Sequence, residues 1–499
     1  MNSNRKLLLN TVTPLFLEII SVISGFVIPR IIMVCYGSEV NGLTQSIMQF
    51  LSIISFMEMG VGGVIQFNLY KPLAKGNNDQ ISRIVVAANK FFRGIAFILI
   101  IYTIILVFIF PSISHHSFDR LYSGVLIVAI SFSFFSQFYF GQVNQLLLNA
   151  DQRAYVQYIA SILCVIANTV ACVALMICGF GIHFVKITTS VIFLFKPLFL
   201  YYYTKKNYHI DYEIRLEGEP IKQKWNGIAQ HLSYVVLDNT DIIVLTTFST
   251  LTNVSIYSVY YLVVGGLKKL MTTAIGGFQA RIGNIIARNN YDELCEVFRL
   301  SEWIIQTIAT FIFSCTAILI VPFVRVYTSG ISDANYIQPL FGLLMTIAFA
   351  CHSFRLPYNC IILSAGHYKQ TQWNYVLAAL LNVVVSVILV IRYGIIGVAI
   401  GTIVAMFMQT VWMGIYSYRN ILHWDLSLLV KQLLVNIVTF ISSYYASNLW
   451  AFSTTNIMEW LLLAVLTAFI VGTLILMINI ILYKSNVVDL WNKLNCNIL

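Results

Sequence analysis

The amino-acid sequence predicts an all-α protein that crosses a membrane many times. Of its 499 residues, 59% are hydrophobic and only 10% are charged, a composition far from that of soluble globular domains. Apolar stretches near the roughly 20 residues that a helix needs to cross hydrocarbon recur along the chain. Several motifs also occur twice, about 213 residues apart (Asn77 and Asn290, for example). These three observations predict a duplicated, polytopic helical fold.

Fourteen apolar stretches are predicted to be transmembrane helices. No short apolar segment with a small-residue cleavage site precedes the first of them, so we expect that stretch to be retained. The connectors are too short to form a large soluble domain. The stretches cover residues 12–34, 41–67, 91–112, 121–148, 155–178, 182–203, 226–248, 254–280, 300–326, 337–363, 372–392, 396–418, 430–450 and 458–483.

Three pairs of motifs, in the same order, indicate the internal duplication. The offset between them spans six predicted helices, and an even number gives both copies the same orientation in the membrane. A duplicated membrane unit of this kind is typical of transporters with two lobes. The pairs are Asn77-Asn78-Asp79-Gln80 with Asn289-Asn290-Tyr291-Asp292, Leu148-Asn149-Ala150-Asp151 with Leu363-Ser364-Ala365-Gly366, and Gly181 with Gly394.

The duplication predicts four parts of the chain. Residues 1–204 form an N-terminal lobe of six helices, and residues 226–420 form a C-terminal lobe of six more. The charged stretch 205–225 is the expected cytoplasmic linker, and residues 421–499 add two helices and a cytoplasmic tail outside the repeat.

The basic residues indicate the orientation of the chain. The net charge is +10, with thirty Lys and Arg residues. If the N-terminus is cytoplasmic, twenty-one of them lie at cytoplasmic ends or connectors, and only Arg120, Arg325 and Arg392 fall on the opposite side. This is the positive-inside bias of membrane proteins. We therefore expect both termini in the cytoplasm and no nucleic-acid partner.

The sequence contains no recognisable catalytic or metal-binding motif. It has no GxSxG, Walker or HExxH pattern, so we expect neither an enzyme nor an ATP-driven pump. None of the nine cysteines forms a CxxC pair, and most lie in apolar stretches, which predicts no disulfide, metal or other cofactor. Transport would then depend on an ion gradient, the membrane potential or the gradient of the substrate.

Polar residues recur in steps of three or four along the stretch 41–67, which on one continuous helix would form a single polar stripe. Such a stripe cannot face lipid. It lines a water-accessible cavity or forms a seam of interhelical hydrogen bonds, and Gln45, Gln49 and Glu58 are candidate substrate-binding residues. The stripe consists of Asn41, Gln45, Gln49, Ser52, Ser55, Glu58, Gly62 and Gln66.

Cations inside three other stretches are further candidate substrate ligands. Arg30 follows Pro29, Arg355 lies close to Pro357, and Lys269 shares a face with polar residues of the stretch 254–280. A cation at this depth needs an anion, which is either a phosphate-bearing ligand or a carboxylate of another helix. For Lys269 that carboxylate would be Glu58 or Glu18. Lys268 lies about 100° away on the helix, and we expect it to contact a neighbouring helix.

Acidic residues in the stretch 226–248 are candidates for coupling to an ion gradient. Asp238, Asp241 and His231 lie on one helical face, where they could bind and release a proton or Na⁺. The alternative is a structural network in which the carboxylates bind Asn239, Thr240 or an arginine of the other lobe. His231 alone is more typical of a structural residue.

Several strings resemble landmarks of Wzx-type polysaccharide flippases, which belong to the multidrug, oligosaccharidyl-lipid and polysaccharide exporter (MOP) superfamily. Their order and number, rather than any single string, carry this resemblance, which covers nearly the whole chain. The strings are Tyr36-Gly37-Ser38-Glu39-Val40-Asn41-Gly42-Leu43, Glu58-Met59-Gly60-Val61-Gly62, Leu69-Tyr70-Lys71-Pro72-Leu73-Ala74, Asp238-Asn239-Thr240-Asp241, Val254 with Tyr257, and Arg355-Leu356-Pro357 through Ala365-Gly366-His367-Tyr368-Lys369.

The resemblance implies two six-helix bundles around a V-shaped cavity that opens alternately to each side. It implies that undecaprenyl-diphosphate-linked oligosaccharide repeat units move from the inner to the outer leaflet of the bacterial cytoplasmic membrane, for O-antigen or capsule synthesis. Cation antiport is implied as well, with cavity arginines and lysines on the diphosphate. Arg30 fits the family's first-helix arginine, whereas Lys269 and Arg355 are assigned here from face and depth. Expected partners are the lipid-linked oligosaccharide, membrane lipids, the polysaccharide polymerase and glycosyltransferases.

Two other functions stay open from the sequence. A cation-coupled multidrug exporter would have a cavity dominated by acidic rather than basic residues. A membrane scaffold of a polysaccharide assembly complex would transport nothing, and its buried charges would be purely structural.

Overall fold

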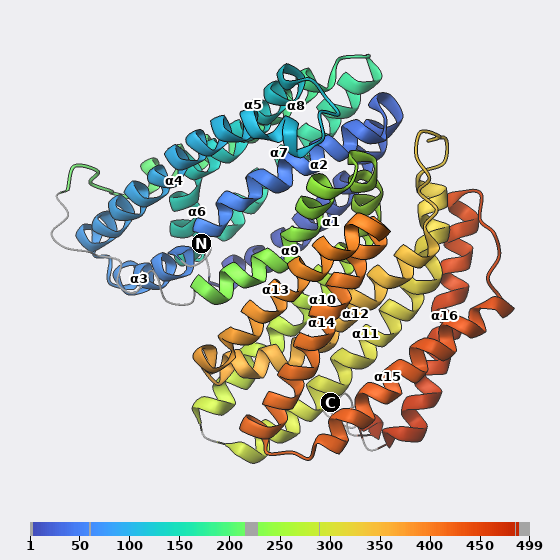
Figure 1. The fold of residues 1–499 in the computed structure, drawn as a ribbon. Helices are drawn as coiled ribbons and strands as arrows, with labels where there is room; N and C mark the ends of the chain where they lie inside the picture. The colour runs from blue at the N-terminus through green and yellow to red at the C-terminus, as the bar shows by residue number, and fades with distance from the viewer. Residues whose placement is uncertain (1–2, 59–60, 215–227, 289, 485, 489–499) are drawn as a thin grey trace. The chain divides into compact units, whose positions relative to one another are not determined.

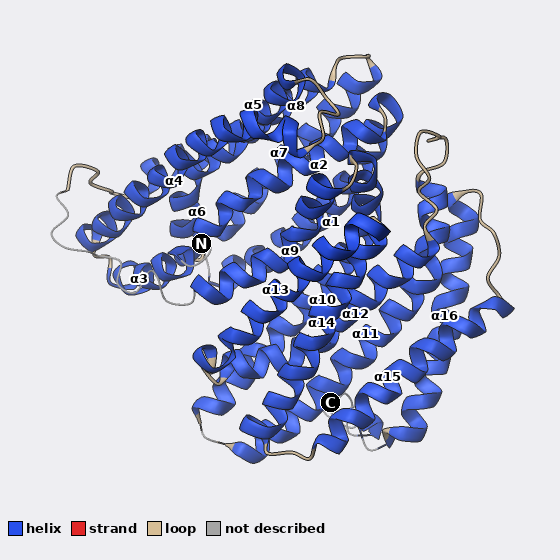
Figure 2. Cartoon of the chain, in the orientation of Figure 1, coloured by secondary structure: helices blue, strands red, loops and turns tan. Residues whose placement is uncertain are grey.

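The computed structural model describes residues 3–58, 61–214, 228–288, 290–484 and 486–488 (Figure 1). Within these residues the regular secondary structure is helical and contains no strand (Figure 2). Eleven helical segments in the described part are long and apolar enough to cross a membrane. The prediction of an all-α, multi-pass membrane protein is therefore confirmed, while the number of fourteen crossings stays a prediction.

The chain divides into two compact units. The first comprises Met1–Val235 with Leu245–Ser255, and the second comprises Val236–Val244 with Ile256–Leu499. Helices α9 (Ile228–Phe248) and α10 (Leu251–Ala287) contribute to both units. The predicted linker at 205–225 begins inside α8, which ends at Asn207, and its residues 215–225 lie outside the described part.

The helices of the first unit follow one another with short connections. Apolar runs of 24 to 36 residues form its long helices. A π-helical segment, η2 (Gln137–Gly141), joins α5 to α6. The order is α1 (Ser3–Tyr36), α2 (Ser38–Ser52), η1 (Ile53–Met57), α3 (Val61–Lys75), α4 (Asn78–Ile113), α5 (Arg120–Ser136), η2, α6 (Gln142–Ala150), α7 (Ala154–Ile177) and α8 (Ile182–Asn207).

The second unit contains longer uninterrupted helices and the C-terminal pair. Helices α15 and α16 both pack against α11 (Figure 1). After α9 and α10 the order is α11 (Tyr291–Tyr327), α12 (Pro339–Ser364), α13 (Tyr368–Tyr393), α14 (Ile395–Ser417), η3 (Tyr418–Leu422), α15 (Leu426–Ala446), η4 (Ser447–Leu449) and α16 (Ile457–Leu482).

The stretch 41–67 is not the single continuous helix that its polar periodicity predicts. Helix α2 ends at Ser52 and is followed by a 3₁₀ segment, η1, before α3 begins at Val61. Five residues at 3.0 per turn rather than 3.6 rotate the following side chains by about 100°. The predicted polar stripe through the whole membrane is therefore wrong, because its two halves lie on different helices.

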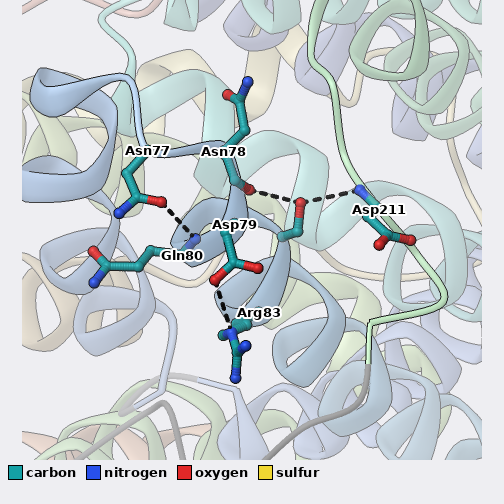
Figure 3. Close-up of polar contacts among 7 residues, drawn as sticks. Asn77, Asn78, Asp79, Gln80, Arg83 and Asp211 are labelled. Carbon is teal, nitrogen blue, oxygen red and sulfur yellow. Dashed lines mark hydrogen bonds and ion pairs between the residues drawn. The ribbon is translucent and has the colours of Figure 1, made fainter.

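The two units repeat the same helix caps at the duplicated motifs. The Asn77 side chain accepts a hydrogen bond from the Gln80 N–H at 3.1 Å, which caps α4 (Figure 3). At the corresponding start of α11, Asn290 accepts from the Glu293 N–H at 3.3 Å. In each case the side chain binds one of the N–H groups that a helix start leaves without a partner.

The connection after α8 is attached to the capped start of α4 (Figure 3). Ser82 Oγ donates to the Asn78 carbonyl at 2.7 Å and accepts from the Asp211 N–H at 3.0 Å. Beside it, Asp79 and Arg83 form an exposed ion pair of 3.0 Å within α4. The chain that leaves α8 is thus attached to α4 through the backbone N–H of Asp211 rather than through a charged side chain.

The ends of α6 and α12 form the same turn as well. Gln152 and Gly366 both adopt positive φ, at 57° and 75°. The next N–H group in each case reaches back five residues, from Arg153 to the Leu148 carbonyl and from His367 to the Ile362 carbonyl, as in a Schellman motif. The third pair differs, because Gly394 has φ 54° whereas Gly181 is extended.

Helix packing follows one order in both units. In the first, α4 packs on α5, α5 on α8 and α7 on α8. In the second, α11 packs on α12, α12 on α14 and α13 on α14. Equal caps and equal packing order are what a duplication requires.

Helices α13 and α14 approach closely through a Gly-xxx-Gly pair on α14. A Cβ added at Gly397 would lie 2.7 Å from the Val390 backbone N, and one at Gly401 would lie 2.8 Å from the Ser386 backbone N. Small residues four apart let membrane helices pack with their backbones in contact.

We expect Gly401→Ala to lower the thermal stability of the purified protein in detergent. The added methyl would force α13 away from α14, at a cost of about 1–3 kcal/mol. The matched control is Gly266→Ala in α10, where a Cβ meets no atom within 4 Å and should be neutral or slightly stabilising. Equal melting temperatures for the two variants would contradict the close contact.

Candidate functional site

Asp241 of α9 is a buried carboxylate bound by side chains of three other helices. The residue is 4% exposed. Its Oδ2 accepts hydrogen bonds from Tyr257 Oη of α10 and Thr402 Oγ1 of α14, both at 2.8 Å. Its Oδ1 lies 3.4 Å from Asn382 Nδ2 of α13, which also donates to Thr402 Oγ1 at 3.2 Å. Helices α9, α10, α13 and α14 therefore all contribute side chains to the site of one buried carboxylate.

The close contact of α13 with α14 positions this site. Ser386 lies one helical turn after Asn382 on α13, and Gly401 immediately precedes Thr402 on α14. Because Gly401 has no side chain, the two backbones come near enough for the Asn382 amide to reach the Thr402 hydroxyl. The small-residue packing thus determines the geometry around the carboxylate.

The Asp241 site presents oxygen atoms suited to a small cation. The carboxylate oxygens, Tyr257 Oη and Thr402 Oγ1 converge there, and the Asn382 amide contacts them through its Nδ2. Asn382 is completely buried, and its Oδ1 has no hydrogen-bond partner in the described part of the chain. A buried acceptor of this kind calls for an explanation, and carboxylate, amide and hydroxyl oxygens are the ligands of hard cations.

The described residues contain no cluster of three or more His, Cys, Asp or Glu side chains that could hold a metal ion. Of the predicted partners of the carboxylates within α9, Thr240 donates through its Oγ1 to the Val236 carbonyl. The predicted helix around Asp238 and His231 is present as α9. Their side chains lie outside the described part of the structure.

A second polar cluster lies in the core of the same unit, on α12. Arg355 and His352 are 3% and 2% exposed, and Arg355 Nη2 lies 2.8 Å from His352 Nδ1. Lys268 of α10 is buried too, with its Nζ 5.9 Å from the Phe349 ring centroid. Lys269 is exposed. The lysine that reaches α12 is thus Lys268, and Lys269 remains accessible to a ligand.

In the first unit, some polar residues form hydrogen bonds between helices, whereas the candidate substrate-binding residues remain partly accessible. Asn41 Nδ2 donates to Ser255 Oγ at 2.8 Å, and Ser46 pairs with Thr246 at 2.7 Å. These two side chains form an interhelical hydrogen-bond seam. The other candidates keep part of their surface accessible: Arg30 is exposed, and Gln45, Gln49 and Glu58 are half-buried.

Two residues of the Asp241 site, Asn382 and Thr402, were missed as candidates from the sequence. Both are isolated polar residues in apolar stretches. A polar side chain inside a membrane stretch is a functional candidate by default, which is the signal that could have identified them. Nothing in the sequence shows that Asn382 and Thr402 contact Asp241, because the contact is tertiary.

No protein-family model and no curated protein matches the chain. Solved structures do resemble it. A lipid II flippase, MurJ, in an inward closed conformation superposes with a TM-score of 0.71 at 13% identity, covering 96% of this chain and 100% of that one. An inward-facing MATE family multidrug transporter of the MOP superfamily gives 0.60 at 14% identity, covering 80% and 93%.

A eukaryotic MATE transporter, AtDTX14, gives a TM-score of 0.56 at 13% identity and covers 83% of this chain and 94% of its own. Sequence identities this low establish the fold alone. The chain therefore has the fold of MOP-type transporters.

We expect Tyr257→Phe to destabilise the protein by about 1.5–3 kcal/mol, because it removes a hydrogen bond to a buried charge. The measurement is thermal unfolding in detergent. Tyr445→Phe on α15 is the control, since Tyr445 is 69% exposed. If the two variants unfold at the same temperature, the hydroxyl of Tyr257 does not stabilise Asp241.

Proposed function

We propose that this protein is a flippase that moves undecaprenyl-diphosphate-linked oligosaccharides across the bacterial cytoplasmic membrane by alternating access. The observation that carries the proposal is the similarity to a lipid II flippase over 96% of the chain, a range that includes part or all of the C-terminal helices α15 and α16. We place both termini in the cytoplasm, as the positive-inside bias predicts.

The proposed substrate has physical requirements that the candidate residues meet. Hydrocarbon rejects the charge of a diphosphate and the hydroxyls of a sugar chain, so both need a polar route while the polyprenyl tail stays in lipid. In the second unit, the exposed Lys269 would bind the diphosphate, and Arg355, which is buried beside His352, would bind it only in a conformation that opens this core. In the first, Arg30 would do so, while Gln45, Gln49 and Glu58 would bind sugar hydroxyls.

We propose further that transport is coupled to a cation, Na⁺ or H⁺, at Asp241. Its carboxylate, the free acceptor of Asn382 and the hydroxyls of Thr402 and Tyr257 would coordinate Na⁺ directly. If the coupling ion is H⁺, the same hydroxyls would hydrogen-bond to Asp241 in both its protonated and its deprotonated state, because a hydroxyl both donates and accepts hydrogen bonds. Asp238 and His231 remain candidates for the same coupling.

A multidrug exporter is the second candidate function, because two of the similar structures are MATE transporters. It would leave polysaccharide synthesis intact and change drug sensitivity on deletion. A scaffold that only assembles a polymerase and glycosyltransferases would move no lipid at all.

Purified protein in liposomes should move a labelled polyprenyl-diphosphate oligosaccharide between leaflets. Lys269→Glu should reduce the rate at least about tenfold, because it replaces an attraction for the diphosphate by a repulsion of a few kcal/mol. Arg281→Glu changes the same charge further along α10, at another exposed position, and should retain activity. Full activity of Lys269→Glu would exclude its role, and no transport by the wild type would favour the scaffold.

Na⁺ should raise the melting temperature of the wild type more than K⁺ does. At 100 times the dissociation constant, a single bound ion stabilises a protein by about 2.7 kcal/mol. Thr402→Val keeps the shape but removes one oxygen ligand, and it should lose most of the shift. If the melting temperature of the wild type rises equally in both salts and the protein releases protons on substrate binding, the coupling ion is H⁺ rather than Na⁺.

A further inference from the structure

A polar cavity lies in the second unit where the ends of four helical segments meet. Its volume is about 300 Å³, and it is lined by the third and fourth turns of α11, the first two turns of α15, the start of η3 and the end of α16. Arg299, Glu302, Lys431 and Gln432 are among its lining residues. None of them belongs to the Asp241 site or to the residues proposed to bind the transported substrate.

The two cations of this cavity are held over aromatic rings. Arg299 Cζ lies 5.3 Å from the Trp424 ring centroid, and Lys431 Nζ lies 5.1 Å from that of Tyr483. Both residues are exposed. The ion pairs seen among the described residues, such as Arg83 with Asp79 and Arg153 with Asp151, do not involve Arg299 or Lys431, so neither cavity cation is neutralised by a described carboxylate. Aromatic contacts orient a cation without cancelling its charge.

The carboxylate of the cavity is bound by other groups. Glu302 is 5% exposed and accepts hydrogen bonds from Tyr358 Oη at 2.7 Å and Tyr418 Oη at 3.0 Å. Two positive charges and one negative charge leave the cavity with a formal charge of +1. A phosphodiester carries one negative charge, and its oxygens match the guanidinium fork of an arginine.

The rim of the cavity is apolar and continues along the lipid-facing sides of α15 and α16. Leu428 and Leu482 line the cavity and are 47% and 43% exposed. Leu434, further along α15, is 56% exposed, and Ile481, next to Leu482 on α16, is 76% exposed. Acyl chains would cover such surfaces, and the basic residues place this end of the helices at the cytoplasmic headgroup layer.

We propose that this cavity binds the phosphodiester headgroup of an anionic phospholipid from the cytoplasmic leaflet. Arg299 and Lys431 bind the phosphate, and the acyl chains lie along α15 and α16. The lipid is a bound ligand of the C-terminal helix pair and is not transported. Its binding therefore does not depend on the proposed flippase activity.

Native mass spectrometry of the purified full-length protein tests this site. Wild type should bind phosphatidylglycerol at least about tenfold more tightly than phosphatidylcholine, a difference of about 1.4 kcal/mol. Arg299→Gln with Lys431→Gln should lose this preference. The matched control is Lys71→Gln with Arg93→Gln in the first unit, because both residues are exposed and Arg93 also lies over a ring, 4.9 Å from the Tyr139 centroid. The control should keep the preference.

Three further results decide the proposal. If the target and control variants lose the preference for phosphatidylglycerol equally, the proposal is overturned, since any surface charge would then suffice for binding. Binding of inorganic phosphate by the wild type, with no preference between the two lipids, would overturn the lipid assignment in favour of free phosphate. Arg299→Lys with Lys431→Arg keeps both charges and should retain the preference, and its loss in this folded variant would also overturn the site.

Leu428→Glu provides an independent test if the double glutamine variant fails to fold. It adds a carboxylate at the exposed rim and should reduce phosphatidylglycerol binding at least about tenfold, through repulsion of the phosphate. An unchanged preference would show that the headgroup binds elsewhere.

Discussion

Hydrocarbon cannot hydrogen-bond, and the whole structure depends on this constraint. Every backbone and side-chain polar group at membrane depth needs a partner within the protein or in water. Helices satisfy the backbone, which is why the apolar stretches become helices whatever their individual propensities. Side chains such as Asp241, Asn382 and Thr402 find partners only where helices approach closely. Close packing through Gly397 and Gly401 is therefore a condition for the polar site as well as for stability.

The helices and their caps could be predicted from the sequence, because both depend on neighbours along the chain. Apolar length predicts a helix, and Asn77 and Asn290 cap the helices that follow them. The break between α2 and α3 could not be predicted from periodicity, since the steps across it, from Ser52 to Ser55 to Glu58, are steps of three residues that occur in an α-helix as well as in a 3₁₀ segment. This break matters for the predicted substrate-binding residues, because it separates Gln49 on α2 from Glu58 after η1.

The candidate sites were predicted in part. Asp241 and Arg355 were identified because a charge inside an apolar stretch is visible without any structure. Their partners were not, because Asn382 and Thr402 reach Asp241 from helices more than 140 residues away along the chain. The choice between Lys268 and Lys269 required the structure as well. Adjacent residues on a helix face different neighbours, and only Lys268 faces α12.

A comparison of the two units shows that the Asp241 carboxylate has no counterpart at the corresponding position of the first unit. At an offset of 213 residues, Asp241, Asn382 and Thr402 correspond to Ile28, Thr169 and Thr189. There the hydrogen bonds join uncharged groups: Thr169 donates to Ser24 at 2.7 Å, and Thr189 pairs with Cys172 at 3.2 Å. The first unit thus packs the corresponding helices without a carboxylate at these positions. Burying a carboxylate costs several kcal/mol unless it is compensated, and Tyr257, Thr402 and Asn382 provide that compensation in the second unit. The second unit therefore holds the kind of charge that the proposed cation coupling requires.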